Sequence, residues 1–400
     1  MLFRSAAPEM AAPPPAPRRS CLAAPGLRLS LLMGAVFLIF GVHMSYLPAW
    51  LQGRGLSPTE ISLTMALPMM LRLVVTPAVA FAADRRCAHR DFMIGAAVCV
   101  LVLLLALTGV RSIALLIVLV VVMQIVLQTI LPMADTITLA AVRAEGLDYG
   151  RIRLWGSISF ILATFSVGWA VARNGPEAVL ALSITGAALT TAAALWLPRA
   201  APTSRVQLSL QQAFATARDP AFVLFVVTVG LLQASHAVFY IFSVIHWRSQ
   251  GLSEIYIASL WSIGVVAEII LFWYARRLGA LGASGLLVAG GVAGVVRWGT
   301  LAGDPAHVWL LPLQILHAGT FAATHLGTMN WIATRIPPSA AGTAQAVVSA
   351  FTTGIAMAGA TMLAGPLYAR FGGQAYLAMA VLAAAGIATA LMLRRLEAGK

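Results

Sequence analysis

Charged residues are scarce in this 400-residue chain: Asp, Glu, Lys and Arg make up 10% of it, against 60% hydrophobic residues. Lysine is almost absent, because Lys400 is the single one and Arg supplies the other basic residues. The mean hydropathy of +0.90 is unlike that of a soluble domain. The net charge of +13 does not indicate nucleic-acid binding, because the basic residues lie in short loops between apolar runs rather than in a patch.

Cysteine is also rare, and the signatures of common enzymes are missing. Cys21, Cys87 and Cys99 are odd in number and have no metal-ligand spacing, so we expect no disulfide and no metal site. The chain has no nucleotide-binding loop, nucleophile elbow, zinc-protease helix or dinucleotide fingerprint. We therefore predict no catalytic residues, no cofactor and no ATP-driven transport.

The chain does contain a series of apolar runs of about 20 residues, the length that crosses a bilayer as a helix. Lipid satisfies no backbone hydrogen bonds, so these runs must be helical. We predict an all-α membrane protein with twelve transmembrane helices. The predicted spans are 29–51, 59–82, 92–110, 113–142, 154–173, 177–197, 220–246, 255–275, 284–302, 306–334, 341–368 and 374–393.

The longest interior loop divides the predicted spans into six and six. We expect a disordered cytoplasmic tail over 1–27, rich in Ala and Pro, and an N-terminal six-helix bundle over 28–197. A cytoplasmic linker over 198–219 would lead to a C-terminal six-helix bundle over 220–400. A secretory signal peptide is the competing interpretation of the N-terminus. The apolar run that begins at Leu29 is too long for one and has no small-residue cleavage site.

Basic loop residues predict the orientation of the chain in the membrane. Most of them lie in segments on the same side as the N-terminus. The opposite loops carry only Arg54, Arg111, Arg173, Arg248 and Arg370. We therefore expect a multi-pass protein of the bacterial inner membrane with both termini in the cytoplasm.

The two halves share short sequence matches after their first spans. The tripeptide 55–57 (Gly-Leu-Ser) recurs at 251–253, an offset of 196 residues. The same offset places Arg72 on Glu268, so two membrane-embedded charged residues fall at equivalent positions.

A second match relates the fourth span to the tenth. The dipeptide that begins at Gln124 recurs at Gln314, an offset of 190, which places Asp135 on His325. Parallel repeats of this kind relate the halves of major facilitator transporters, whose substrate sites lie at the repeat interface near the middle of the membrane.

Five charged side chains lie inside or at the start of apolar runs: Arg72, Asp135, Arg153, Glu268 and Arg297. A charge at the centre of a bilayer costs ~2.5–3.5 kcal/mol on insertion scales, so these residues must face a protein interior or a water-filled cavity. This pattern indicates a transporter. Burial disfavours a charged carboxyl, so Glu268 is the candidate proton carrier, with Arg297 as its modulator or an anion ligand. A static ion pair of Glu268 with Arg297 or Arg72 is the alternative.

Polar side chains also recur in the seventh and tenth spans. His317 and Thr320 share one face of the tenth span, and His325 lies two turns further on, rotated by about 80°. His236 and Tyr240 lie one turn apart in the seventh span. These side chains either line a substrate cavity or make ordinary interhelical hydrogen bonds and packing contacts.

The loop between the second and third spans contains Asp84 and Arg85. Together they fit part of the Gly-x-x-x-Asp-Arg-x-Gly-Arg-Arg signature of major facilitator proteins. Ala80 and Cys87 replace the two glycines, and a solvated run of charges is the alternative. We expect Asp84 and Arg85, together with Asp148 and Arg151 in the loop between the fourth and fifth spans, to take part in conformational change.

The segment 148–157 (Asp-Tyr-Gly-Arg-Ile-Arg-Leu-Trp-Gly-Ser) resembles the loop 4–5 signature of lactose permease-type, nucleoside and phenylpropionate permease-type proton symporters. We expect Arg151 to pair with Asp148 at the membrane surface. In the lactose permease family, a carboxylate of the fourth span and the second arginine of this signature bind substrate. The resemblance carries that role to Asp135 and Arg153, which we expect to pair.

The resemblance to the lactose permease family also assigns the coupling residues. The family's glutamate, arginine and histidine of spans 8, 9 and 10 correspond to Glu268, Arg297 and His317. Its proton-carrying carboxylate lies one turn after that histidine, where this chain has Thr320. The departure shifts the proton-carrying role to Glu268.

The chain is most similar to the phenylpropionate permease family over the segments 147–160, 234–268 and 294–320. This resemblance implies proton-driven uptake of an aromatic carboxylic acid such as 3-phenylpropionate or cinnamate. Phe239, Trp261 and Trp298 are candidates to flank its ring. The side chains expected to contact substrate are Asp135, Arg153, Arg72, His236, Tyr240, Trp261, Thr320 and His325.

Other functions are compatible with the same sequence. A sugar, oligosaccharide or nucleoside symporter is the first alternative, followed by an efflux antiporter and a non-transporting membrane sensor. An intramembrane enzyme is least favoured, because no nucleophile–base pair is visible. The expected partners are a small-molecule substrate, protons and the lipid bilayer, with the protein a monomer that binds no nucleic acid.

Overall fold

A computed structural model describes residues 24–86, 88–197 and 218–398. Within these ranges the chain is almost entirely helical and contains no strand. Ten helices in the described part are long and apolar enough to cross a membrane. The residues 1–23 of the expected tail and 198–217 of the expected linker lie outside the described ranges.

Six helices form the first half of the molecule. Helix α1 packs against α5 and α6, α3 packs against α4 and α6, and α2 packs against α4. These helices are α1 (Ala24–Gly53), α2 (Pro58–Arg86), α3 (His89–Leu107), α4 (Ile113–Glu145), α5 (Tyr149–Asn174) and α6 (Ala178–Trp196).

The second half has more elements, because several of its spans are built from consecutive helical pieces. Two of these pieces, η2 and η3, are π-helical. The first elements are α8 (Pro220–Ala234), α9 (Ala237–Ser249), α10 (Glu254–Trp273), α11 (Ala275–Leu278), η1 (Gly279–Leu281) and α12 (Gly282–Leu301). They are followed by α13 (His307–His317), η2 (Ala318–Ala323), α14 (Thr324–Arg335), α15 (Pro338–Ser349), η3 (Ala350–Ala356), α16 (Met357–Phe371), η4 (Gly372–Ala375) and α17 (Tyr376–Ala398).

The helices match the twelve predicted spans in order, with shifted boundaries. Helix α1 begins at Ala24, so the last four residues of the expected tail are helical. Helix α2 continues to Arg86, which places Asp84 and Arg85 in its last turn rather than in a loop. The tenth predicted span contains the π-helix η2 between α13 and α14. The last two predicted spans are joined through the short helix η4.

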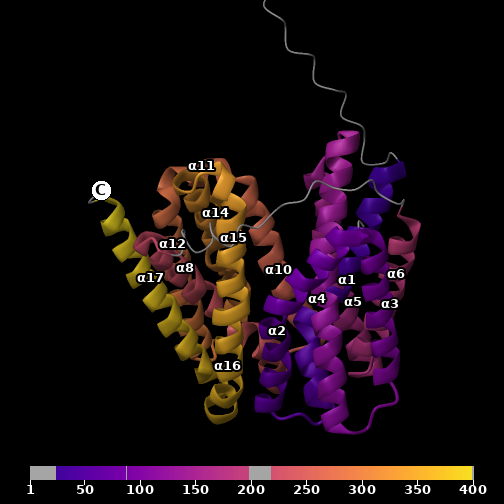
Figure 1. Ribbon diagram of the computed structural model, residues 1–400. Helices are drawn as coiled ribbons and strands as arrows, with labels where there is room; N and C mark the ends of the chain where they lie inside the picture. The colour runs from indigo at the N-terminus through magenta and orange to yellow at the C-terminus, as the bar shows by residue number, and fades with distance from the viewer. Residues whose placement is uncertain (1–23, 87, 198–217, 399–400) are drawn as a thin grey trace, which may run out of the picture.

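The two halves form two bundles that meet along a central interface (Figure 1). Helix α2 packs against α16, α5 against α10, and α1 against α9. The Tyr46 hydroxyl donates to the Glu254 carbonyl at 3.2 Å, and the Ser62 hydroxyl donates to the Met362 carbonyl at 3.5 Å. These contacts lie near the ends of α1 and α16 and the starts of α2 and α10, so the bundles close together at the end away from the chain termini.

The matching tripeptides form the same turn in both halves. Gly55 and Gly251 have φ angles of +93° and +81°, in the left-handed region that glycine tolerates. Each turn ends with a serine, Ser57 in the first half and Ser253 in the second. Their hydroxyls accept the backbone N–H of Glu60 and of Tyr256, both at 3.3 Å, and so cap the following helix. The repeat therefore fixes how α2 and α10 begin.

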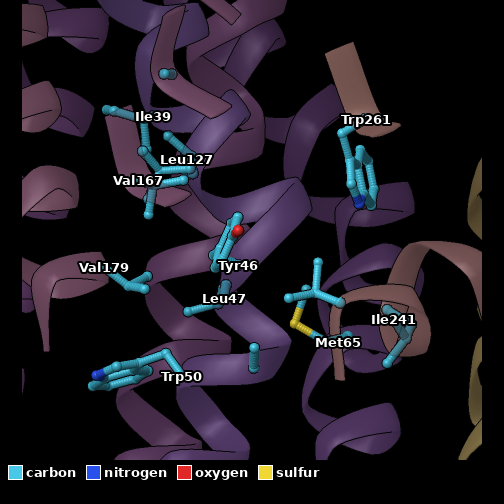
Figure 2. Close-up of a cluster of buried hydrophobic side chains, with 14 of the residues drawn as sticks. Ile39, Tyr46, Leu47, Trp50, Met65, Leu127, Val167, Val179, Ile241 and Trp261 are labelled. Atoms are coloured by element: carbon cyan, nitrogen blue, oxygen red, sulfur yellow. The ribbon is translucent and has the colours of Figure 1, made fainter. Parts of the chain in front are cut away.

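The main hydrophobic core surrounds α1 and includes residues of both halves (Figure 2). Tyr46 and Trp50 of α1 are almost fully buried, and Trp261 of α10 lies in the same cluster. Large side chains from α1 thus fill the space between α5, α6 and the second half, which leaves α1 as a central helix of the interface.

Candidate functional site

A cavity of about 210 Å³ lies between the two halves. Helices α1 and α5 line it from the first half, and α9, α10, α12, α13 and η2 line it from the second. Its polar wall contains Arg153, Glu268, Arg297, Gln314 and His317. Four of these five belong to the second half, and Arg153 faces them from the first.

Arg297 of α12 is fully buried and is held by neutral acceptors. One guanidinium nitrogen donates to the Gln314 amide oxygen at 2.6 Å. The other lies 3.1 Å from His317 Nδ1 and 3.2 Å from the Thr320 hydroxyl. The guanidinium also lies 4.4 Å from the Phe239 ring centroid. Because these partners carry no negative charge, they leave the positive charge of Arg297 uncompensated.

His317 connects Arg297 to Glu268. A guanidinium has only donors, so His317 Nδ1 must accept, and its Nε2 carries the hydrogen. That Nε2 lies 3.7 Å from Glu268 Oε2. No direct ion pair of Glu268 with Arg297 or Arg72 occurs in the described part of the chain. The static pair considered from the sequence is therefore replaced by a row in which the imidazole lies between the two charges.

Arg153 of α5 brings a positive charge of the first half to this row. Its guanidinium lies 3.9 Å from the Phe37 ring centroid and lines the cavity. It lines the same cavity as Glu268, which faces it from the other half. A Cβ at Gly156 would come within 2.9 Å of the guanidinium, so a larger residue there would displace the Arg153 side chain.

The expected ion pair between Asp135 and Arg153 is not formed among the described residues. Instead, the Tyr149 hydroxyl donates to Asp135 at 2.9 Å and takes the place of a direct contact. The expected pair of Asp148 and Arg151 is present at 3.9 Å. Asp148 also caps α5, because its side chain accepts the N–H of residue 151 at 3.2 Å.

Aromatic rings form much of the remaining cavity wall. Phe239 and Trp261 stack with ring centroids 5.0 Å apart. Six aromatic side chains contribute to the wall: Phe37, Phe160, Phe239, Tyr240, Trp261 and Phe321. Such a surface suits a flat apolar body, and the charged row adds polar groups to the same wall.

The residues predicted for substrate binding and proton coupling fall into three groups: those on the cavity wall, those on a neighbouring cavity and those on neither. The cavity wall holds Arg153, Tyr240, Trp261, Glu268, Arg297 and His317. Arg72 and His325 line a separate neighbouring cavity.

Asp135, His236 and Thr320 do not line either cavity. His236 is fully buried, and its Nε2 lies 3.0 Å from the Thr320 hydroxyl, which in turn contacts Arg297. Trp298 lies in the same layer and donates to the Ser235 hydroxyl at 3.1 Å. His236, Thr320 and Trp298 thus pack behind Arg297, on its side away from the cavity.

Asp84 and Arg85 lie away from the cavity, at the end of α2. Asp84 forms an ion pair with His89 at 2.9 Å, and Arg85 lies 5.7 Å from the Phe81 ring centroid. Gln314, Phe37, Phe160 and Phe321 are wall residues that sequence reasoning did not propose for the site. Only Gln314 had a sequence indication, because it opens one of the two repeated dipeptides.

Two helical bundles with an embedded, charged cavity between them define a membrane transporter of the major facilitator type rather than an enzyme. Residues 27–378 match the MFS_1 like family, and the chain belongs to this family. The fold class and the family resemblance drawn from the sequence are thus confirmed.

Two curated relatives span most of the chain. It is 32% identical over 354 residues to the probable 3-phenylpropionic acid transporter of Escherichia coli (strain K12), which covers 87% of this chain and 92% of the relative. It is 29% identical over 377 residues to the maltose permease of Geobacillus stearothermophilus, covering 90% and 93%. Both are transporters by name.

The crystal structure of the nucleoside transporter NupG has the same fold. It superposes with a TM-score of 0.81 at 17% identity, over 92% of this chain and 98% of that one. This likeness supports the arrangement of the helices and says nothing about the substrate of this chain.

Proposed function

We propose that the protein is a proton-coupled symporter that imports a small aromatic monocarboxylate such as 3-phenylpropionate. The observation that carries the proposal is the cavity that joins Arg153 and the row Glu268–His317–Arg297 to six aromatic side chains. The name of the Escherichia coli relative agrees with this substrate class. Arg153 would bind the carboxylate, and Phe239 and Trp261 would cover the ring.

Glu268 is proposed to carry the coupled proton. Glu268 and Arg153 line the same cavity from opposite halves, so a charged Glu268 would attract Arg153 and compete with a substrate carboxylate for the guanidinium. A proton on Glu268 removes that competitor, so Arg153 becomes free to bind the substrate carboxylate through charge-assisted hydrogen bonds. Protonation and substrate binding would then favour each other, which is the requirement for symport.

The conformation supports transport by alternating access. The bundles are in contact at the end away from the termini, where Tyr46 bonds to Glu254. With both termini in the cytoplasm of a bacterial inner-membrane protein, this state would be closed to the outside. We propose a monomer as the working unit, because each chain contains both halves of the cavity.

The proposal is tested with the purified protein in liposomes. An inward proton gradient is imposed, and uptake of radiolabelled 3-phenylpropionate is measured with maltose and uridine as competitors. We expect gradient-dependent accumulation of the aromatic acid that neither competitor reduces. Accumulation of maltose or uridine instead would contradict the substrate assignment, and accumulation that ignores the gradient would contradict proton coupling.

The role of Glu268 is tested separately from the substrate. Glu268→Gln should lose gradient-driven accumulation but retain exchange of labelled for unlabelled substrate, because the neutral amide imitates the protonated carboxyl. Glu145→Gln, at the end of α4 and away from the cavity, is the matched control and should behave like the unmodified protein. Accumulation by Glu268→Gln with an unchanged pH dependence would exclude Glu268 as the proton carrier.

A further inference from the structure

A second cavity, of about 470 Å³, adjoins the candidate site. Met44, Tyr240 and Phe321 line both cavities and form the wall between them. Helices α2 and α4 line the second cavity from the first half of the chain, and α8, α14, α15 and η3 are among the elements that line it from the second. Arg72 is the one permanently charged side chain among its described lining residues.

The internal repeat makes this second cavity the counterpart of the first. The offset of 196 residues, which relates α2 to α10, maps three lining residues of one cavity onto three of the other. The pairs are Met65 and Trp261, Met69 and Val265, and Arg72 and Glu268.

The other lining helices follow the same relation. The offset of 190 pairs Gln124 with Gln314 and Leu127 with His317. At an offset of 192 residues, the lining residues of α5 pair with those of α15 and η3. These pairs are Arg153 and Gln345, Ser157 and Ser349, and Phe160 and Thr352, of which the two serines are identical. Lining residues of one cavity therefore recur at the equivalent positions of the other half in the second cavity.

The two cavities differ in the charges at equivalent positions. Arg72 occupies the position of Glu268, and the neutral Gln345 occupies that of Arg153. Arg72 donates to the Gln128 amide oxygen at 3.0 Å and to the Thr353 hydroxyl. It takes part in no ion pair within the described residues, so its charge is uncompensated in the membrane interior, where an anion is strongly favoured.

We propose that the second cavity is a separate binding site for a small organic carboxylate with an apolar body, whose anion is bound by Arg72. Its volume falls in the range of roughly 300–1,000 Å³ that small-molecule sites occupy. Five methionines line it, and their flexible thioethers adapt to apolar ligands of different shapes. They are Met44, Met65, Met69, Met329 and Met357. An inorganic anion would satisfy Arg72 but leave this wall uncovered.

The alternative is that Arg72 has a purely structural role, and the experiment must distinguish this role from anion binding. Arg72 belongs to α2 and Thr353 to η3, so their hydrogen bond joins the two halves. The neighbouring Leu73 packs closely against Gly354 of the same element. If joining the halves were the only role, removing Thr353 would have the same effect on ligand binding as removing Arg72.

The methionines of the second cavity serve as built-in reporters. The purified full-length protein is labelled with methyl-13C methionine and titrated with 3-phenylpropionate and, separately, with octanoate. We expect the methyl signals of Met65, Met69, Met329 and Met357 to shift, because these side chains line the second cavity alone. Shifts confined to Met44, which lines both cavities, would overturn the proposal.

Variants then assign the anion site. Arg72→Gln should weaken the titration of these four signals by about tenfold or more, as expected for the loss of a charge-assisted hydrogen bond. Thr353→Val removes the bond between the halves and should leave the titration within about twofold, well under one tenfold step. Equal weakening in both variants would mean that Arg72 acts only as a structural link, and an unchanged titration in Arg72→Gln would overturn its role as the anion ligand.

Two further measurements distinguish a failure of this inference from a failure of the proposed function. Arg153→Gln should abolish binding in the first cavity but leave the four methionine signals responsive. If the aromatic acid is not the transported substrate, octanoate should still shift them, because the second site is defined by charge and apolar body. Sodium chloride at the same concentration should not reproduce the shifts, and if it did, the occupant would be an inorganic anion and the proposal would fail.

Discussion

Gln314 holds the buried guanidinium of Arg297 in position. Its amide oxygen accepts the shortest hydrogen bond that Arg297 makes, at 2.6 Å. Its amide nitrogen has no partner in the described structure, so the side chain is held by this one contact. The site therefore depends on a neutral acceptor at a position where a carboxylate would neutralise the charge.

Gln314→Leu should destabilise the protein, because the Arg297 guanidinium would keep its burial and lose an acceptor. We expect a loss of ~1–3 kcal/mol, the cost of leaving a buried polar group unsatisfied. A lower apparent melting temperature in detergent would reveal it. Gln52→Leu, at an exposed position of α1, is the matched control. An unchanged melting temperature for Gln314→Leu would mean that His317 and Thr320 alone satisfy Arg297.

Arg153 should not tolerate replacement by lysine. A lysine keeps the positive charge but loses the planar fork that binds a carboxylate bidentately and the stacking on Phe37. Arg153→Lys should raise the KM for uptake by about tenfold, one step of about 1.4 kcal/mol. Arg173→Lys, near the other end of α5, provides the comparison and should leave KM unchanged. Equal KM values for the two variants would show that Arg153 acts only through its net charge.

At the scale of elements, the π-helix η2 lies within the polar stripe of the tenth span. His317 and Thr320 share a face as expected, because both contact the same guanidinium nitrogen of Arg297. The π-helix over Ala318–Ala323 shifts the phase of the residues that follow it, because each π-turn holds more residues than an α-turn. His325 lies beyond η2 and lines the second cavity instead of the first. Sequence periodicity alone does not encode such a turn.

The contact between α2 and α16 closes the far end of the interface. A Cβ at Gly365 of α16 would come within 2.1 Å of the Ser62 hydroxyl oxygen and 2.6 Å of the Pro58 carbonyl. Only glycine permits this approach, so a large side chain there must hold the two helices apart.

Gly365→Trp should therefore block the closed state and reduce transport to background. Gly359→Trp, on the same helix with no atom near its added Cβ, should transport normally. Ligand binding and the apparent melting temperature are measured for both variants, since a blocked but folded Gly365→Trp still binds. Normal uptake by Gly365→Trp would show that the far end need not close this tightly during transport.

At the scale of the whole molecule, repetition and composition made the fold predictable. Apolar runs gave the spans, and the repeated tripeptide placed equivalent turns before α2 and α10. The contacts between side chains of different helices could not be predicted from the sequence. Tyr149, rather than Arg153, hydrogen-bonds to Asp135, and His317 lies between Arg297 and Glu268. These relations depend on how helices cross in space, which no short-range pattern contains.

The division of the charged site between two halves leads to a last prediction, on the pH dependence of binding. Arg153 belongs to one bundle and Glu268 to the other, and both line the same cavity. The attraction between them exists only while Glu268 is charged. Lowering the pH neutralises Glu268 and frees Arg153, so the affinity for 3-phenylpropionate should rise toward acid pH, provided the acid itself stays ionised. One coupled proton gives at most about tenfold per pH unit.

Equilibrium binding to the purified protein, measured at several pH values without a gradient, checks this dependence. Glu268→Gln should bind tightly throughout and lose the pH dependence, because its amide never competes for Arg153. Glu145→Gln should keep the dependence of the unmodified protein. If Glu268→Gln retained a tenfold change per pH unit, the coupled proton would reside on another group. The substrate carboxylate would then bind Arg153 without competition from Glu268, and the pH dependence would need a different titrating group.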